Sequence, residues 1–376
     1  MSARVAIACS GLGHVRRGNE TWAATVADAL HRAGTTVTLL GGGPHAPSAA
    51  PFVRLKNLPR ETPITRGWLS WHHRYLLEQR TFARSLTRWL REHPHEIIHL
   101  ADPALAWILQ RHAASLRVRV IYKDGLLLGP DWCRKFAHVQ ILAPYYLEQA
   151  QATGLDTRGW HVIPHLVDPA RFQPATDFVR AAARDKFFGN RISRDTFVIL
   201  AVGDFSPQSN KRLDWIIREI AQLPDPHSVH LVLAGQASAT DLSAFETRAR
   251  AALGERVTLL PNLAAAEMPN VYGCADAFAH AALREPFGIV FLEALASGLP
   301  VVAHHFPVTR WIIGDGGLTV DAESPGTIAA ALDHWRRDPA ARRAIGERAR
   351  ARAVSGFAPE KIVPLYQNLY EAVSRA

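Results

Sequence analysis

The sequence predicts an α/β protein of two domains, and three observations support this. Residues 5–9 form a short apolar run, a glycine-containing loop follows, and a helical pattern over 21–32 precedes a second apolar run at 36–40. Apolar runs alternate with helical patterns again in the second half of the chain. The 376 residues suffice for two domains of ordinary size, and the proline-punctuated passage 162–172 is a natural boundary between them.

The composition is that of a globular protein without a membrane span. Hydrophobic residues make up 48% of the chain and charged residues 20%, and no apolar run reaches the length of about 18 residues that a span needs. The short apolar run near the amino terminus is also less than a signal peptide requires. We therefore expect a cytoplasmic protein, with peripheral contact at the inner face of the membrane left open.

Charge and cysteine content narrow the possible partners. The formal net charge of +9 would suit nucleic acid, an anionic membrane or a phosphorylated substrate. Because the arginines are spread along the chain without a basic block, nucleic acid is the weakest of these options, and we expect none. The three cysteines are widely spaced and lack a CxxC pair, so neither a disulfide framework nor a zinc site is predicted.

Residues 62–93 show leucines at helical spacing beside many arginines. A core-facing helix with a solvated arginine face is the simpler interpretation. The alternative is an acceptor-binding or membrane-surface element, since basic amphipathic helices bind anionic interfaces and aromatic and histidine side chains crowd the start of the stretch. These side chains are Trp68, Trp71, His72, His73 and Tyr75.

The strand predicted within 96–103 brings His99 towards a ligand-binding edge. Ligands bind at the carboxyl ends of strands in an open α/β sheet, so we expect residues 99–102 to face the cleft between the domains. His99 is either a functional residue there or a histidine that is satisfied within the structure. Two further strands are predicted at 118–122 and 139–143.

The second half of the chain repeats the alternation of strands and helices after a charged helix and linker at 177–195. The predicted elements are strands at 197–202, 231–235, 257–260, 275–279 and 301–303 and helices at 241–253 and from 268. The final helix has an apolar stripe, and we expect it to pack back on the first domain. The stripe is made of Ile362, Leu365, Leu369 and Val373.

The most informative stretch is 285–302, EPFGIVFLEALASGLPVV. Pro286 suits the first turn of a helix, and Gly298 suits the left-handed position after the last turn. Glu285 is then in the loop before the helix and Glu293 about two turns inside it, which separates the carboxylates by roughly 10 Å. They are too far apart to share one metal ion, but they could hold opposite ends of an extended ligand.

The predicted helix start between these acids offers an anion site. The amides of Phe287, Gly288 and Ile289 lie where a helix leaves its N–H groups without intrahelical acceptors, and the helix dipole adds positive potential there. A nucleotide sugar has the matching layout, with a hexose, a diphosphate and a ribose in a row. An amphipathic helix with two solvated acids is the alternative interpretation.

The stretch closely resembles the E-x7-E motif of GT-B retaining glycosyltransferases, specifically the GT4 family, written here Glu285-Pro286-Phe287-Gly288 through Glu293. The resemblance implies that Glu285 faces the donor sugar. It also implies that the residues from Pro286 to Ile289 hold the sugar and phosphate, and that Glu293 binds the ribose hydroxyls.

Other segments resemble the same family. Lys211 and Arg212 match cations that hold the donor diphosphate, although Asp204 stands where the family usually has arginine. Gly18 matches the point where the first loop approaches the donor phosphate. His99 matches the first histidine of the family's H-x-H-D segment. The resemblance therefore implies Glu285, Lys211 and His99 as catalytic residues.

The fold that the resemblance implies consists of two Rossmann-like domains facing across a cleft. Residues 1–170 would bind the acceptor, residues 195–356 would bind the nucleotide sugar, and the helix 357–376 would pack back on the first domain. Cationic side chains and helix amides would stabilise the departing diphosphate, so neither a metal ion nor a separate cofactor is expected.

The implied reaction is transfer of a hexosyl group, with retained stereochemistry, from a UDP- or GDP-sugar to an unidentified acceptor. Two alternatives share the architecture. A hydrolysing sugar-nucleotide epimerase would release nucleoside diphosphate without any acceptor, and a non-catalytic binding protein would hold a nucleotide sugar without consuming it.

Overall fold

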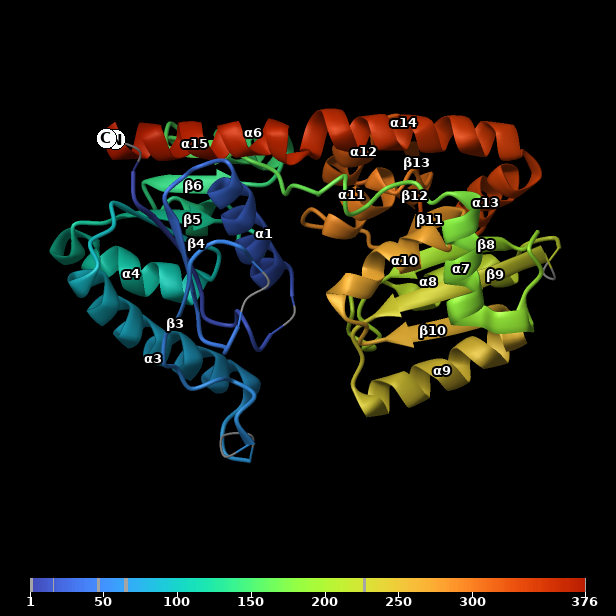
Figure 1. The fold of residues 1–376 in the computed structure, drawn as a ribbon, viewed down its shortest axis with the longest axis horizontal. Helices are drawn as coiled ribbons and strands as arrows, with labels where there is room; N and C mark the ends of the chain where they lie inside the picture. The colour runs from blue at the N-terminus through green and yellow to red at the C-terminus, as the bar shows by residue number, and fades with distance from the viewer. Residues whose placement is uncertain (1–2, 16, 46–47, 64–66, 226–227, 376) are drawn as a thin grey trace. The chain divides into compact units, whose positions relative to one another are not determined.

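The structure is a computed structural model that describes residues 3–15, 17–45, 48–63, 67–225 and 228–375. The chain divides into two compact units. Unit 1 is Met1–Leu166 with Pro359–Ala376, and unit 2 is Val167–Ala358. Each unit has its own parallel β-sheet with helices packed on it (Figure 1). No helix in the described part of the chain is long and apolar enough to cross a bilayer.

Unit 1 contains a seven-stranded sheet in the order β3-β2-β1-β4-β5-β6-β7. The strands are β1 (Val5–Cys9), β2 (Val37–Gly41), β3 (Phe52–Arg54), β4 (Ile97–Leu100), β5 (Arg119–Lys123), β6 (His138–Ile141) and β7 (Trp160–Val162). The strand order reverses direction between β1 and β4, and this switch point is where open α/β sheets bind ligands.

Helices cover both faces of this sheet, which explains why its central strands are apolar along their whole length (Figure 1). α1 (Gly18–Arg32) and α15 (Pro359–Arg375) pack on one face. α3 (Trp71–Glu92) and α4 (Pro103–Leu116) pack on the other. The shorter helices of this unit are α5 (Pro130–Cys133) and α6 (Pro144–Ala152).

The final helix is fixed to unit 1 by hydrogen bonds as well as by apolar packing. The Trp22 indole and the Gln140 amide both donate to the hydroxyl of Tyr366, each at 2.9 Å. The prediction that Leu365 belongs to the buried stripe is wrong, because this side chain is 38% exposed. Val363, Tyr366 and Tyr370 are buried instead. The buried face follows the helical i, i+4 spacing through the two tyrosines.

Unit 2 contains a six-stranded parallel sheet in the order β10-β9-β8-β11-β12-β13. The strands are β8 (Phe197–Val202), β9 (Val229–Gly235), β10 (Val257–Pro261), β11 (Ala277–His280), β12 (Val301–His304) and β13 (Gly317–Val320). The helices are α7 (Asp177–Phe188), α8 (Leu213–Ala221), α9 (Ala239–Leu253), α10 (Met268–Gly273), α11 (Ile289–Ala296), α12 (Pro307–Ile313), α13 (Thr327–Arg337) and α14 (Pro339–Phe357).

Two boundaries differ from the predicted ones. The helix predicted over 62–93 begins only at Trp71, because the Ser70 side chain accepts a hydrogen bond from the His73 amide and caps it. Residues 64–66 of that prediction lie outside the described residues. The stretch predicted as helix and linker, 177–195, belongs to unit 2, since arginines of α7 pair with Asp276 at 2.6 and 3.1 Å.

Candidate functional site

Lys211 and Glu285 meet in unit 2, although 74 positions separate them in the sequence. Lys211 follows β8 and Glu285 follows β11, and these strands are parallel neighbours. Loops at the carboxyl ends of adjacent parallel strands share one edge of the sheet, which brings the two side chains together. The Lys211 ammonium donates to Glu285 Oε2 in a partly buried ion pair.

Gly203 makes room for the Lys211 side chain. A β-carbon at position 203 would lie 2.7 Å from Cβ and 2.9 Å from Cγ of Lys211. Real β-carbons do not approach carbon atoms this closely, so a larger residue would displace the lysine stem. Asp204 is exposed, and its carboxylate accepts from the Ser206 amide at 2.7 Å.

His280 is a third member of this group that sequence reasoning missed. It is the last residue of β11, and its ring is 1% exposed. Nδ1 accepts from the Ala282 amide, so in the neutral ring Nε2 carries the proton. Nε2 lies 3.6 Å from Glu285 Oε2 and has no hydrogen-bond partner among the described residues.

The environment keeps His280 uncharged. Burial and the nearby Lys211 cation lower the pKa of His280 to about 3. The site therefore consists of a lysine cation, a carboxylate and a neutral imidazole that directs its N–H towards that carboxylate. Only the position of His280 at the end of a buried strand could have suggested it from the sequence.

α11 starts later than predicted. Gly288 is the cap residue at φ +82°, in the left-handed region that favours glycine, and the helix runs from Ile289. Pro286 is therefore in the loop and not in the first turn. Phe287 is buried, with its ring 6.4 Å from that of Trp311. The first turn of α11 still directs N–H groups towards the Glu285 loop.

Glu293 lies one turn inside α11, not two, because the helix begins at Ile289. The Tyr272 hydroxyl donates to Glu293 Oε2 at 2.7 Å. Burial raises the pKa of Glu293 to about 7, against the lowering effect of the Tyr272 hydrogen bond. Tyr272 is fully buried at the end of α10 and was not predicted as a site residue.

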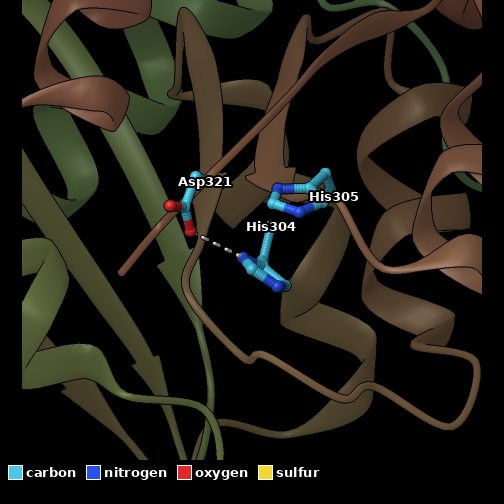
Figure 2. Close-up of side chains that lie close together, drawn as sticks. All are labelled: His304, His305 and Asp321. Carbon is cyan, nitrogen blue, oxygen red and sulfur yellow. Dashed lines mark ion pairs between the residues drawn. The ribbon is translucent and has the colours of Figure 1, made fainter. Parts of the chain in front are cut away.

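Arg212 and the end of β12 complete this edge of unit 2. Arg212 precedes α8 at φ +52°, and its guanidinium lies over the Trp215 ring at 4.2 Å. At the ends of β12 and β13, His304 Nδ1 lies 3.9 Å from Asp321 Oδ1, and the His305 ring is beside that of His304 (Figure 2).

The His304, His305 and Asp321 side chains could offer three ligand atoms within 4.8 Å of one another. His304 Nδ1 already accepts from the Ala322 amide at 3.2 Å, and His305 Nδ1 lies 3.1 Å from the Val320 carbonyl. Because His304 Nδ1 accepts an amide hydrogen, Nε2 of the neutral His304 ring carries the proton and has no lone pair for a metal ion. The donor set is therefore better described as a polar cluster that backbone hydrogen bonds hold in place.

His99 and Gly18, the other predicted site residues, belong to unit 1. His99 is fully buried in β4, its Nδ1 lies 3.1 Å from the Tyr370 hydroxyl, and burial lowers its pKa to about 3. These contacts with α15 favour the structural alternative for His99. Gly18 is the exposed first residue of α1, and the adjacent Asn19 accepts from the Lys123 ammonium at 3.2 Å.

Unit 1 has a polar network of its own around β1 and α3. The buried carboxylate of Glu78 lies 2.7 Å from His14 Nε2 and accepts from the Arg60 guanidinium at 2.5 Å. Gln79 donates to the Ser10 hydroxyl at 2.7 Å, which places this network beside the carboxyl end of β1. His14 Nδ1 and Gln79 Oε1 are buried without a hydrogen-bond partner among the described residues. Sequence reasoning singled out none of these residues.

Comparison with known proteins places these features in a family. Residues 183–352 match the family described as Glycosyl transferases group 1. The D-inositol 3-phosphate glycosyltransferase of Kineococcus radiotolerans is 34% identical over 223 residues, which cover 54% of this chain and 49% of that protein. The mannosylfructose-phosphate synthase of Agrobacterium fabrum is 31% identical over 40% of this chain and 33% of its own length. The chain thus spans half or less of these two curated relatives.

Solved structures give the same fold over the whole chain. Sucrose-phosphate synthase from Thermosynechococcus elongatus has a TM-score of 0.80 at 20% identity and covers 99% of both chains. HepE of Anabaena, solved in complex with UDP-glucose, has a TM-score of 0.77 at 16% identity and covers 100% of both. At this level of identity the likeness concerns the fold.

The two parallel sheets and these structural neighbours define a GT-B protein, as predicted. The range that matches the glycosyl transferases group 1 family, residues 183–352, contains Lys211, Glu285 and Glu293.

Proposed function

We propose that this protein is a retaining glycosyltransferase that moves a hexosyl group from a nucleoside-diphosphate sugar to an acceptor. The main support is the ion pair between Lys211 and Glu285 beside the first turn of α11. Glu293 lies on the same helix. The arrangement supplies a cation, a helix N-terminus and two acids within one unit. It is supported by the relatives named as glycosyltransferases, and by structural neighbours solved with UDP-glucose and ADP.

The donor diphosphate would bind at the first turn of α11, with Lys211 and Arg212 as its cations. As the bond from the sugar carbon to the diphosphate oxygen breaks, negative charge grows on the leaving group. Preorganised cations and helix amides stabilise that charge in the transition state, so no metal ion is needed in this scheme.

The two acids have separate roles in the proposal. Glu285, held between Lys211 and His280, would orient the sugar hydroxyls. Glu293, held by the Tyr272 hydroxyl, would accept hydrogen bonds from the ribose. The acceptor would attack from the face that the diphosphate leaves, and we assign no covalent nucleophile.

Unit 1 would bind the acceptor. The network of Glu78, His14 and Arg60 lies beside the carboxyl end of β1. Its atom His14 Nδ1 lacks a hydrogen-bond partner among the described residues and would bond to a polar acceptor substrate that reaches it. This part of the proposal is independent of the donor residues, since all three side chains belong to unit 1.

The donor is tested by a thermal-shift panel of UDP-, GDP- and ADP-sugars, because a ligand that binds only the folded state raises apparent stability. The sugar that stabilises the protein is then incubated with and without candidate acceptors, and the products are analysed. Transfer that requires an acceptor supports the proposal. Nucleoside diphosphate released without acceptor indicates the epimerase, and an unconsumed donor indicates a binding protein.

Two substitutions should separate donor binding from chemistry. Glu293→Ala removes a contact that is equal in the ground and transition states, so the donor KM should rise about tenfold with little change in kcat. Lys211→Ala removes a charge needed mainly as the diphosphate departs, so kcat should fall by about 100-fold or more. Steady-state kinetics with the donor varied checks both, and wild-type constants in both variants would refute the donor site.

A further inference from the structure

A groove of about 690 Å³ lies between α3 and α4 of unit 1, apart from the residues assigned to the reaction. Four arginines of α3, one arginine of α4 and a half-exposed tryptophan line it. We call it the arginine groove. These residues are Arg80, Arg84, Arg88, Arg91, Arg111 and Trp107.

The arrangement follows from how α3 packs. Phe82, Leu86 and Leu90 are buried against the sheet, so the arginines stand on the opposite, exposed side of the helix. Arg80, Arg84 and Arg88 are four residues apart and therefore neighbours in one row. Like charges at this spacing destabilise a helix by a few tenths of a kcal/mol per pair, and the lining of the groove contains no carboxylate.

Elsewhere on the surface the chain pairs its arginines. Arg158 bonds Asp156, Arg250 bonds Glu246 and Arg336 bonds Asp333, at 2.6 to 2.9 Å. None of the five groove arginines has an ion pair within the ranges that the structure describes. Five unneutralised guanidinium groups in one groove indicate that their counter-charge comes from outside the chain.

The α4 side of the groove adds an interfacial aromatic group. The Trp107 ring is 38% exposed, and Arg111 and Lys135 lie 5.9 and 5.4 Å from it. Indole side chains suit the boundary between an apolar and a wet phase. Arginines bind phosphate oxygens in a bidentate manner. Trp107 and the His112 imidazole are the aromatic rings among the residues that line the groove, too few for the successive stacking on which single-stranded nucleic acid relies.

We propose that the arginine groove docks unit 1 on a membrane surface that carries phosphate headgroups with net negative charge. The apolar face of α3 is occupied by the protein core, so the helix does not insert its leucines and the contact is electrostatic. Binding is then reversible and sensitive to salt. Each arginine close to an anionic surface contributes about 1 kcal/mol, which corresponds to roughly fivefold in partitioning.

The test is sedimentation of the full chain with lipid vesicles. Vesicles of phosphatidylcholine with about 30% phosphatidylglycerol should retain the protein at about 0.1 M NaCl and release it at about 0.5 M, where screening shortens the range of the charges. Pure phosphatidylcholine vesicles should not bind. The double variant Arg84→Gln/Arg88→Gln should partition about 25-fold more weakly, at roughly fivefold per charge.

A control variant changes net charge equally on other helices of unit 1. Arg32 and Arg375 are exposed residues of α1 and α15, and Arg32→Gln/Arg375→Gln should alter partitioning by less than about twofold. Both variants should keep the wild-type unfolding temperature, because the four side chains are exposed. Equal partitioning of the two double variants would overturn the proposal.

Two further arms exclude other sources of negative charge. Soluble glycerol phosphate at millimolar concentration should not displace the protein from vesicles, and displacement would indicate a small-anion site instead. A single-stranded oligonucleotide that bound the wild type but not Arg84→Gln/Arg88→Gln would reassign the groove to nucleic acid. Unchanged donor binding in the same variants would show that the outcome is separate from the reaction.

Discussion

His280 shows how one buried side chain can prepare a reactive group. Its Nδ1 accepts from a backbone amide, so the proton on Nε2 faces Glu285 Oε2 from 3.6 Å, while Lys211 contacts the same oxygen. In the proposed reaction the His280 N–H and the Lys211 cation both face one oxygen of Glu285, and the other oxygen would orient a sugar hydroxyl. We infer that His280 acts through Glu285 as a positioning residue.

Substituting His280→Phe should lower kcat by about tenfold, because the N–H dipole that faces Glu285 Oε2 across 3.6 Å is lost, and tenfold corresponds to roughly 1.4 kcal/mol. The donor KM should change little. Folding stability should fall by about 1–3 kcal/mol, because the buried Ala282 amide loses its acceptor, although the phenyl ring keeps the packing beside Phe291. Steady-state kinetics and urea unfolding measure the two effects.

His230→Phe is the matched control for His280. His230 is also a buried histidine of unit 2, and its Nε2 lies 2.8 Å from the Thr258 hydroxyl. Its loss should reduce stability, because Thr258 is left without its partner, but kcat should remain at the wild-type value. A similar kcat loss in both variants would mean that His280 is only a packing residue.

Glu293 should make unit 2 less stable as the pH rises through the window from 4.5 to 7. The pKa of this carboxyl is raised to about 7 in the folded protein from its ordinary 4.5, so the folded state binds more protons than the unfolded state in that window. Stability falls with pH wherever this holds, by at most about 3 kcal/mol here. Glu293→Gln cannot ionise and should become relatively more stable between pH 5 and 8.

Urea unfolding at each pH measures the stability difference between Glu293→Gln and the wild type. Glu347→Gln, which changes an exposed acid of the same unit, provides the control. The stability difference between Glu293→Gln and the wild type should grow as the pH rises. If it does not grow, the Glu293 carboxyl is already ionised in the folded protein at low pH.

At the scale of elements, Gly288 sets both the start of α11 and the position of Glu285. A β-carbon there would lie 2.7 Å from the Phe291 ring and 2.9 Å from Glu285 Cγ. Gly288→Ala should therefore destabilise the protein by about 1–3 kcal/mol through the strained left-handed backbone. It should also lower kcat by at least about tenfold, because Glu285 must move.

Gly298→Ala distinguishes these two effects. Gly298 follows the other end of α11 at φ +70°, and its added β-carbon would meet Pro174 at 3.0 Å. A comparable loss of stability is expected, but kcat should stay within about twofold because no site residue is displaced. Calorimetry and kinetics on both variants provide the comparison, and equal kcat values in the two would contradict the role of Gly288.

The same helix shows what the sequence can and cannot predict. The stop at Gly298 follows from local backbone chemistry and was predicted correctly. The start was placed at Pro286, because proline suits a first turn, but the positive φ of Gly288 delays it to Ile289. The close approach of the Phe291 ring and Glu285 Cγ to Gly288 arises in the folded unit, and a local pattern does not encode it.

His280 and Tyr272, which contact the two acids, could not be predicted from the sequence, because their contacts also depend on packing. The alternation of apolar runs predicts parallel sheets, and the acids and Lys211 stand out by their motifs. His280 and Tyr272 do not, because each contacts its acid only after β11 and α10 have packed. For His99 the sequence left a functional and a structural role open, and its contact with Tyr370 of α15 likewise appears only in the folded unit.

At the scale of the whole molecule, the chain builds separate cores in its two units. One core of unit 2 is formed by residues from β8 to α13, whereas the core of unit 1 joins β1 and α1 to the last helix of the chain. Unit 1 therefore combines residues that lie far apart in the sequence, because α15 packs with β1 and α1.

Tyr366→Phe should weaken unit 1 and leave unit 2 unchanged. The hydroxyl accepts from Trp22 and from Gln140, and Gln140 also donates to the Ile163 carbonyl. Removal of the hydroxyl therefore leaves the Trp22 indole without a partner, at about 1–3 kcal/mol, and Gln140 with one hydrogen bond fewer. Calorimetry should resolve two unfolding transitions, and a bound nucleoside diphosphate should shift only that of unit 2. In Tyr366→Phe the transition that the ligand does not shift should move to lower temperature, and the transition that the ligand shifts should keep its temperature. Movement of both transitions together would show that the two cores unfold as one cooperative body.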